Sequence, residues 1–241
     1  LASAIWVGVA GWSYKDWEGV VYPLRKERGF DPLAYLAQYV DLVEINTTFY
    51  RPPAPQMCKS WVRRVCHNSR FRFTAKLWQK FTHEREGVAQ GDIEAFKRGL
   101  EPLATAGRLG CLLIQFPWSF RRSSENQHYV AGLIESFRQH PLALEVRHAS
   151  WDNAETYTWL AEAGVGFCNI DQPLFDRSLR PSARATGPVG YVRLHGRNYQ
   201  EWFRESAGRD DRYNYLYSEE ELVPWVEKII HPGYELLFAV K

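Results

Sequence analysis

Short apolar segments alternate with amphipathic segments along the whole chain, at the spacing of repeated β/α units. Within the apolar segments, polar side chains occupy alternate positions; Val43 and Ile45, for example, flank Glu44. Because successive side chains of a strand point to opposite faces, the apolar set lies on one face and the charged set on the other. The pattern predicts strands that pack against helices and turn their charged face toward a closed interior.

The alternation predicts strands at 5–11, 41–46, 70–76, 109–116, 142–147, 166–171, 189–195 and 234–240. Helices are expected at 31–40, 55–66, 92–106, 124–139, 153–163 and 218–230. Alternating β and α elements favour parallel strands joined by helical crossovers, and this many strands can close a barrel. We therefore predict an α/β fold, a TIM (β/α)8 barrel in a single domain over 1–241. A doubly wound open sheet is the competing architecture, but it favours continuous apolar runs in place of charged alternate positions.

Two segments depart from the regular repeat. Residues 172–188 contain Pro173, Pro181, Gly187 and Pro188, so the sixth helix is expected to be absent or short. The last predicted strand is followed directly by the end of the sequence, and the sequence begins with Leu rather than Met. We expect the native chain to extend at both ends, with a helix after strand eight.

Composition limits the class of protein. The chain has 241 residues, of which 45% are hydrophobic, enough for one large core, and its net charge of +2 is too mild to favour a nucleic-acid partner, although it leaves one open. Its four cysteines show no C-x-x-C spacing, and no apolar run approaches the roughly 20 residues of a membrane span. We expect a cytoplasmic protein without a cofactor or membrane association, whose oligomeric state the sequence leaves open.

Polar side chains recur at the carboxyl ends of the predicted strands, which is where TIM barrels place their active sites. They are Glu44, Asn46, Lys76, Gln115, Glu145, Arg147, Asp171, Arg193 and His195. Counted as full charges, three carboxylates meet three cations, and His195 adds a group that titrates near neutrality. The sequence therefore predicts one polar, charge-balanced site, with an internal ion-pair network as the structural alternative.

The residue types suggest roles. Glu145 and His195 are the first candidates for proton transfer, and Asp171 and Lys76 complete the catalytic set. Arg147 and Arg193 suit an anionic group on a small-molecule substrate. The remaining strand-end residues, together with aromatic residues of the loops, are candidates for contacts with that substrate: Glu44, Asn46, Tyr50, Gln115, Trp12 and Tyr14.

Three functions remain open. The leading hypothesis is an enzyme that uses acid/base chemistry on a small polar, anionic or sugar-like substrate. The second is a metal-dependent hydrolase or isomerase that could act on nucleic acid, with Glu145, Asp171 and His195 as metal ligands. The positive charge of Arg147 and Arg193 counts against this hypothesis, and no metal is predicted. The third is a non-catalytic module that binds a nucleotide or sugar through its aromatic loops, including Tyr213, Tyr215 and Tyr217.

Six segments resemble the YecE-like family, the domain of unknown function 72. They are VGVAGWSYKDW, VEINTTFYRPP, FRFTAK with THER, LIQFPWSF, LEVRHASW and YVRLHGRNY, and they run from Val7 to Trp225 in the order of the family. The resemblance implies a (β/α)8 barrel. It implies no activity, because none is assigned to the family.

Overall fold

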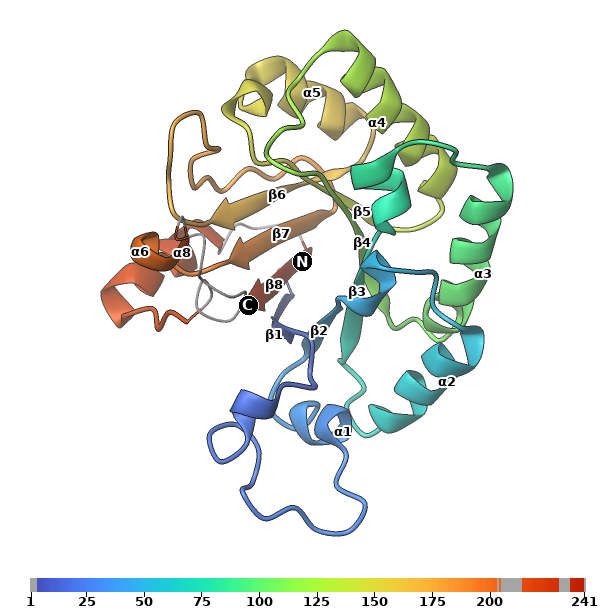
Figure 1. Cartoon of the computed structure of the whole chain (residues 1–241), viewed down its shortest axis with the longest axis vertical. Helices are drawn as coiled ribbons and strands as arrows, with labels where there is room; N and C mark the ends of the chain where they lie inside the picture. The colour runs from blue at the N-terminus through green and yellow to red at the C-terminus, as the bar shows by residue number, and fades with distance from the viewer. Residues whose placement is uncertain (1–3, 203, 205–213, 230–234, 241) are drawn as a thin grey trace. The chain divides into compact units, whose positions relative to one another are not determined.

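The predicted strands and helices are present, in the predicted order. The structure, a computed structural model, describes residues 4–202, 204, 214–229 and 235–240. The strands are β1 (Ile5–Ala10), β2 (Leu42–Ile45), β3 (Arg72–Lys76), β4 (Leu109–Gln115), β5 (Leu142–Glu145), β6 (Gly166–Asp171), β7 (Val189–Leu194) and β8 (Glu235–Val240). The helices are α1 (Pro32–Leu36), α2 (Pro55–Arg64), α3 (Gln90–Thr105), α4 (Ser124–Phe137), α5 (Ala154–Glu162), α6 (Tyr199–Trp202) and α8 (Glu219–Ile229) (Figure 1).

Local sequence explains where several helices begin. Asp31 caps α1 by accepting hydrogen bonds from the backbone amides of Leu33 (2.9 Å) and Ala34 (3.2 Å), and a proline occupies the first position of the helix. Ser123 caps α4 and Asn153 caps α5 in the same way. These caps satisfy amide groups that have no partner inside the helix, so short polar side chains set the helix boundaries.

The main differences from prediction lie at element ends. Helix α1 stops at Leu36 rather than at Val40, because the chain must turn into β2, and the Asp41 amide already donates to the Val7 carbonyl of β1. Strand β5 ends at Glu145 because the residues after it pair with the loop that follows β6: Leu179 donates its amide to the carbonyl of Arg147 (2.8 Å). Residues 230 and 234, at the ends of two predicted elements, lie outside the described residues.

The segment between β6 and β7 contains no helix, as its prolines predict. All of residues 172–188 are described, and they form turns and irregular chain. A four-residue helix that the sequence did not predict, α6, follows β7 instead. After it, α8 packs on β7, where Trp225 and Ile229 contact Val192 and Leu194 in a buried apolar cluster.

The chain divides into two compact units. The first, here the amino-terminal unit, is Trp6–Leu112, and the second, the carboxyl-terminal unit, is Leu113–Lys241 with Leu1–Ile5. Strand β1 pairs with β2 and β2 with β3 in the amino-terminal unit, whereas β5, β6, β7 and β8 pair in sequence in the carboxyl-terminal unit. All of these ladders are parallel. The prediction that residues 1–241 form a single domain stays a prediction.

The strand order is the one that the alternation predicts. The strands are hydrogen-bonded to one another in the order β1, β2, β3, β4, β5, β6, β7, β8, and the sheet closes on itself as a barrel. In the carboxyl-terminal unit, Arg193 of β7 pairs with Glu145 of β5. The charged side chains of these strands thus compensate one another.

Candidate active site

A buried charged cluster lies at the ends of β5 and β7. Glu145, Arg193 and His195 are all at most 1% exposed. Arg193 Nη1 donates to Glu145 Oε2 at 2.5 Å, and Glu145 Oε1 lies 3.9 Å from His195 Nε2. Charges buried in this way must be paired, because an isolated ion costs several kcal/mol to remove from water. The structure thus brings together three of the predicted site residues.

The contact between Arg193 and His195 defines the tautomer of the histidine. Arg193 Nη1 lies 3.2 Å from His195 Nε2. A guanidinium can only donate hydrogen bonds, so Nε2 must accept, and a ring that accepts at Nε2 is neutral and carries its hydrogen on Nδ1. His195 is therefore held as a neutral donor.

Arg147 completes this cluster from the segment after β5. Its Nε and Nη2 atoms donate to Glu145 Oε1 at 3.1 and 2.9 Å. Its side chain is 19% exposed, whereas that of Arg193 is 1% exposed. Glu145, Arg147 and Arg193 together carry one net positive charge, and Arg147 is the cation among them that solvent reaches.

Asp171 belongs to a second network, in the same unit. Arg197 donates to both carboxylate oxygens of Asp171, with its shortest contact at 2.7 Å, and also to Glu221 of α8 at 3.0 Å. Trp225 Nε1 donates to Asp171 Oδ2 at 2.9 Å. The hydrogen bond to Asp171 raises the pKa of Arg197. Asp171 joins β6 to α8 and to the segment after β7.

Several members of this second network could not be found from the sequence. Glu221 and Trp225 lie 50 or more residues from Asp171 in an amphipathic helix, where they look like an ordinary exposed charge and an ordinary core aromatic. Tyr215, from the aromatic segment noted above, donates to Glu221 Oε1 at 2.6 Å, and Tyr217 accepts from the Gly196 amide at 2.9 Å. Tyr213 lies outside the described residues.

The amino-terminal unit contains its own buried pair. Lys76, at the end of β3, lies with its Nζ 3.4 Å from Oε1 of Glu44, on β2. Glu44 is fully buried and Lys76 nearly so. Thr48 holds the end of β3 by donating its hydroxyl to the carbonyl of Lys76 at 2.8 Å. The predicted proximity of Glu44 and Lys76 is thus present within this unit.

The aromatic candidates of the amino-terminal unit differ in their surroundings. Tyr14 donates its hydroxyl to the Ala10 carbonyl at 2.6 Å, and Asn46 Nδ2 lies 3.5 Å from the same hydroxyl. Trp12 packs edge-on against Trp61. Tyr50 is 61% exposed. Tyr14 and Trp12 therefore contribute to packing in this structure, whereas Tyr50 is accessible from solvent.

The last candidate, Gln115, ends β4. Its Oε1 atom is buried and accepts no hydrogen bond from the described residues.

The predicted site residues fall into two groups, one in each unit. Glu145, Arg147, Asp171, Arg193, His195 and Gln115 lie in the carboxyl-terminal unit, and Glu44, Asn46, Lys76, Tyr50, Trp12 and Tyr14 lie in the amino-terminal unit. One mouth that joins both groups stays a prediction.

The predicted carboxylate ligands of the metal hypothesis both contact guanidinium groups. Glu145 accepts from Arg147 and Arg193, and Asp171 accepts from Arg197. Among the described residues, no three side chains of His, Cys, Asp or Glu lie close enough together to hold a metal ion. The positive charge at both carboxylates opposes the approach of a divalent cation.

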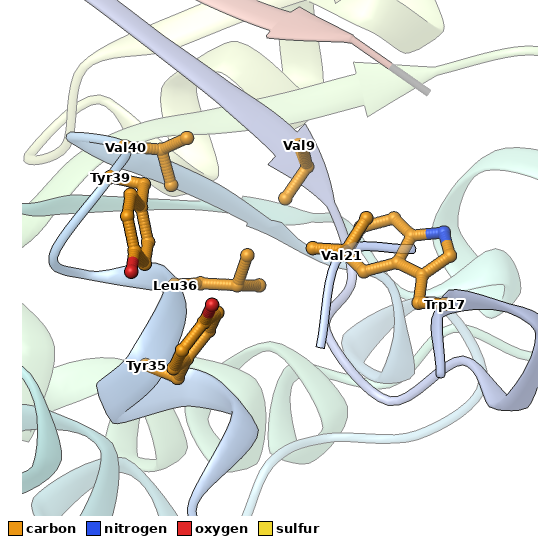
Figure 2. A pocket seen from close by; sticks show the side chains of 7 residues that line it. All are labelled: Val9, Trp17, Val21, Tyr35, Leu36, Tyr39 and Val40. Carbon is orange, nitrogen blue, oxygen red and sulfur yellow. The ribbon is translucent and has the colours of Figure 1, made fainter. Parts of the chain in front are cut away.

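A pocket of about 340 Å³ lies elsewhere, in the amino-terminal unit. Figure 2 shows Tyr35, Leu36, Tyr39 and Val40 of α1 and its carboxyl end on one side, Trp17 and Val21 on the other, and Val9 of β1 between them. The lining contains no charged side chain and none of the predicted site residues. Acid/base chemistry needs polar groups, so the buried charged cluster, not this pocket, is the candidate active site.

In the described part of the chain, no helix is both long and apolar enough to cross a bilayer.

The fold and the cluster define a parallel α/β protein with its buried charges at the carboxyl ends of its strands. A family model described as "Protein of unknown function DUF72" matches residues 6–235. The chain belongs to this family, which confirms the resemblance seen in the six sequence segments.

Curated relatives carry names of the same kind. UPF0759 protein YunF of Bacillus subtilis is 29% identical over 235 residues, which cover 92% of this chain and 81% of YunF. UPF0759 protein YecE of Escherichia coli K12 is 27% identical over 147 residues, 60% of this chain and 48% of YecE. Neither name assigns an activity.

Solved structures of DUF72 family proteins share the fold. A DUF72 family protein from Thermotoga maritima is 34% identical, with a TM-score of 0.83 over 98% of this chain and 91% of its own. One from Enterococcus faecalis is 24% identical, with a TM-score of 0.84 over 98% of this chain and 88% of its own. The second likeness concerns the fold alone.

Proposed function

We propose that this DUF72 family chain is an enzyme that uses acid/base chemistry on a small anionic or sugar-like molecule, at the cluster of Glu145, Arg147, Arg193 and His195. One observation carries the proposal: a neutral histidine and an Arg–Glu ion pair are fully buried together at the carboxyl ends of parallel strands. Ligands of parallel α/β sheets bind at this end of the strands. An apolar cluster would fill the same space at a lower cost in free energy.

The geometry suggests a role for each side chain. The Nδ1–H group of His195 can donate a hydrogen bond or a proton to an oxygen that gains negative charge. Arg193 keeps the ring neutral, and Glu145 positions both guanidinium groups. Arg147, the accessible cation, supplies the contact with an anionic substrate. A reducing, cytoplasmic setting belongs to the proposal and agrees with the four free cysteines of the chain.

The test begins with ligand discovery and continues with a matched pair of variants. A thermal-shift screen of sugar phosphates and organic acids identifies ligands, because a ligand at 100 times its Kd adds about 2.7 kcal/mol to stability. Each ligand is then incubated with the protein, and products are measured by mass spectrometry. Formation of a product supports an enzyme; saturable binding without any product supports a non-catalytic binding module.

His195→Gln and His195→Asn separate catalysis from structure. The longer Gln side chain places an amide oxygen near the position of Nε2, so Arg193 keeps its acceptor while the Nδ1–H donor is lost. We expect His195→Gln to lower turnover by about 10²–10⁴-fold with a melting temperature close to wild type. His195→Asn keeps a donor near Nδ1 but removes the acceptor of Arg193. Wild-type turnover in folded His195→Gln would contradict the proposed role.

Arg147→Gln tests the contact with the anion. Arg147 is partly exposed, so its loss should raise KM with a small change in stability. Arg64→Gln is the matched control, because Arg64 also forms a two-pronged pair with a carboxylate, Asp31, and its side chain is 28% exposed, but it lies in the amino-terminal unit. The control should leave KM unchanged.

A further inference from the structure

Three buried nitrogen donors lie in the loops after β4, β5 and β6, and none of them has a hydrogen-bond partner among the residues that the structure describes. They are Nε1 of Trp118, Nε2 of His148 and Nε2 of Gln172. His148 is 6% exposed and Gln172 is 2% exposed. Leaving a buried donor without an acceptor costs about 1–3 kcal/mol, and native proteins rarely accept that cost several times in one region. The three donors therefore indicate a missing acceptor.

The tautomer of His148 makes it a donor at Nε2. Its Nδ1 atom accepts from the Ser150 amide at 3.1 Å and lies 2.9 Å from the Ser150 hydroxyl, which itself accepts from the Arg122 amide. A nitrogen that accepts from a backbone amide carries no hydrogen, so the hydrogen of the neutral ring is on Nε2. This arrangement leaves Nε2 no lone pair for a metal ion or for a proton.

The surroundings of this histidine are cationic. Burial lowers the pKa of His148, and the positive charges of Arg121 and Arg177 lower it further, whereas Asp176 acts in the opposite sense. Arg121 also lies over the ring of Trp118, 5.9 Å from its centre. His148 is thus a neutral donor in a positive environment, which favours a negatively charged acceptor.

The loops that present these donors pack against one another. The Trp118 ring lies 5.4 Å from the His148 ring and 5.5 Å from that of Phe175. His148 forms an antiparallel bridge with Ser178, so the loop after β6, which begins at Gln172, lies along the segment after β5. The ring contacts and the bridge hold Trp118 and His148 in place before any ligand arrives, which reduces the entropy lost on binding.

We propose that Trp118 Nε1–H and His148 Nε2–H form a binding site for an oxyanion, a carboxylate or phosphate group. An oxyanion offers several lone pairs to neutral donors and is attracted by the nearby guanidinium groups, whereas a cation is repelled by them. The site goes beyond the proposed function and does not depend on catalysis at Glu145 and His195.

The test is an NMR titration of the full chain. The indole N–H signal of Trp118 is assigned by its loss in Trp118→Phe and followed during additions of inorganic phosphate and of acetate, at an ionic strength held constant with sodium chloride. We expect a saturable shift with at least one of the two anions. Phosphate alone, acetate alone or both would identify the group that binds. No saturable shift with either anion, or the same shift with chloride, would overturn the proposal.

Two variants of His148 test whether its Nε2–H group donates to the bound anion. His148→Asn keeps an oxygen that can accept from the Ser150 amide, and Asn is a favourable residue at this capping position, but it lacks a group at Nε2. His148→Gln reaches far enough to place an amide N–H near Nε2. We expect the Kd to rise by about tenfold or more in His148→Asn and to be largely restored in His148→Gln. Trp159→Phe, in α5 of the same unit, is the control and should leave the Kd unchanged. Wild-type affinity in folded His148→Asn would contradict the site.

Discussion

Glu44 and Glu145 occupy equivalent positions in the two units and have different partners. Each is a fully buried glutamate near the carboxyl end of a strand, with an apolar residue on either side of it in the sequence. Glu44 pairs with an ammonium group at 3.4 Å, whereas Glu145 pairs with two guanidinium groups at 2.5–3.1 Å, one of which also contacts a histidine. A guanidinium is a rigid planar donor, but an ammonium sits on a flexible stem. The same strand pattern thus produces pairing with guanidinium groups in one unit and pairing with an ammonium group in the other.

The largest decrease in the free energy of unfolding is expected from Glu145→Gln. The substitution removes the charge that compensates Arg193, which is 1% exposed and cannot reach water. Breaking a buried pair in this way should lower the free energy of unfolding by about 3–5 kcal/mol. Urea denaturation followed by circular dichroism measures the loss. The double variant Glu145→Gln with Arg193→Met should be more stable than the single variant, and a single variant as stable as wild type would show that the pair contributes nothing.

A smaller loss is expected from Glu44→Gln in the other unit. The Lys76 side chain is 9% exposed, and its flexible stem can move the ammonium toward solvent once the carboxylate is gone. The free energy of unfolding should therefore fall by about 1–3 kcal/mol. The same urea experiment measures it. A loss equal to that of Glu145→Gln would mean that the difference between guanidinium and ammonium has no energetic consequence.

The smallest loss of stability is expected when the ion pair between Asp31 and Arg64, which is partly exposed, is removed. Burial raises the pKa of Asp31, but the hydrogen bonds from Arg64, Ala34 and Leu33 outweigh it, so the net pKa lies below its ordinary value. A lowered pKa in the folded state means that stability is present above the ordinary carboxyl pKa and is lost as the pH falls through the lowered one. Asp31→Asn keeps a capping side chain, so we expect it to cost less than about 1 kcal/mol at pH 7.

The difference between wild type and Asp31→Asn should shrink as the pH falls from about 4, where an ordinary aspartate begins to take up a proton. Thermal unfolding from pH 7 to pH 2.5 measures this trend. Asp31→Ala also removes the helix cap and should cost about 1 kcal/mol more at every pH. A difference that grows toward low pH would contradict the assigned direction of the Asp31 pKa.

Short-range information in the sequence predicted much of the fold. Apolar alternation located the strands, prolines located the segment without a helix before β7, and capping residues such as Ser123 account for helix starts. The end of α1 was missed because it depends on a backbone hydrogen bond from Asp41 to β1. Alternation reports which face of a strand is polar, but it does not report which strand compensates its charges.

The candidate site was predicted as positions, not as pairs. The strand-end rule placed Glu145, Arg193 and His195 in one region, and they are in contact. It suggested a catalytic or metal-binding role for Asp171, which stays a prediction; the structure shows that the oxygens of Asp171 accept hydrogen bonds from Arg197 and Trp225. Trp225 is 54 residues away along the chain, so no local pattern connects the two.

The sequence alone determined the order of strands and helices, the polar character of the strand ends and membership of the DUF72 family. The first two properties follow from periodicity, capping and turn residues, which act over a few neighbouring positions; family membership follows from the six segments that match the family. The tertiary structure decided which charges meet, how deeply they are buried and which nitrogen of His148 and His195 carries the hydrogen. Those properties depend on contacts between distant segments, because the free energy of a charge or a donor depends on which groups replace the water it loses.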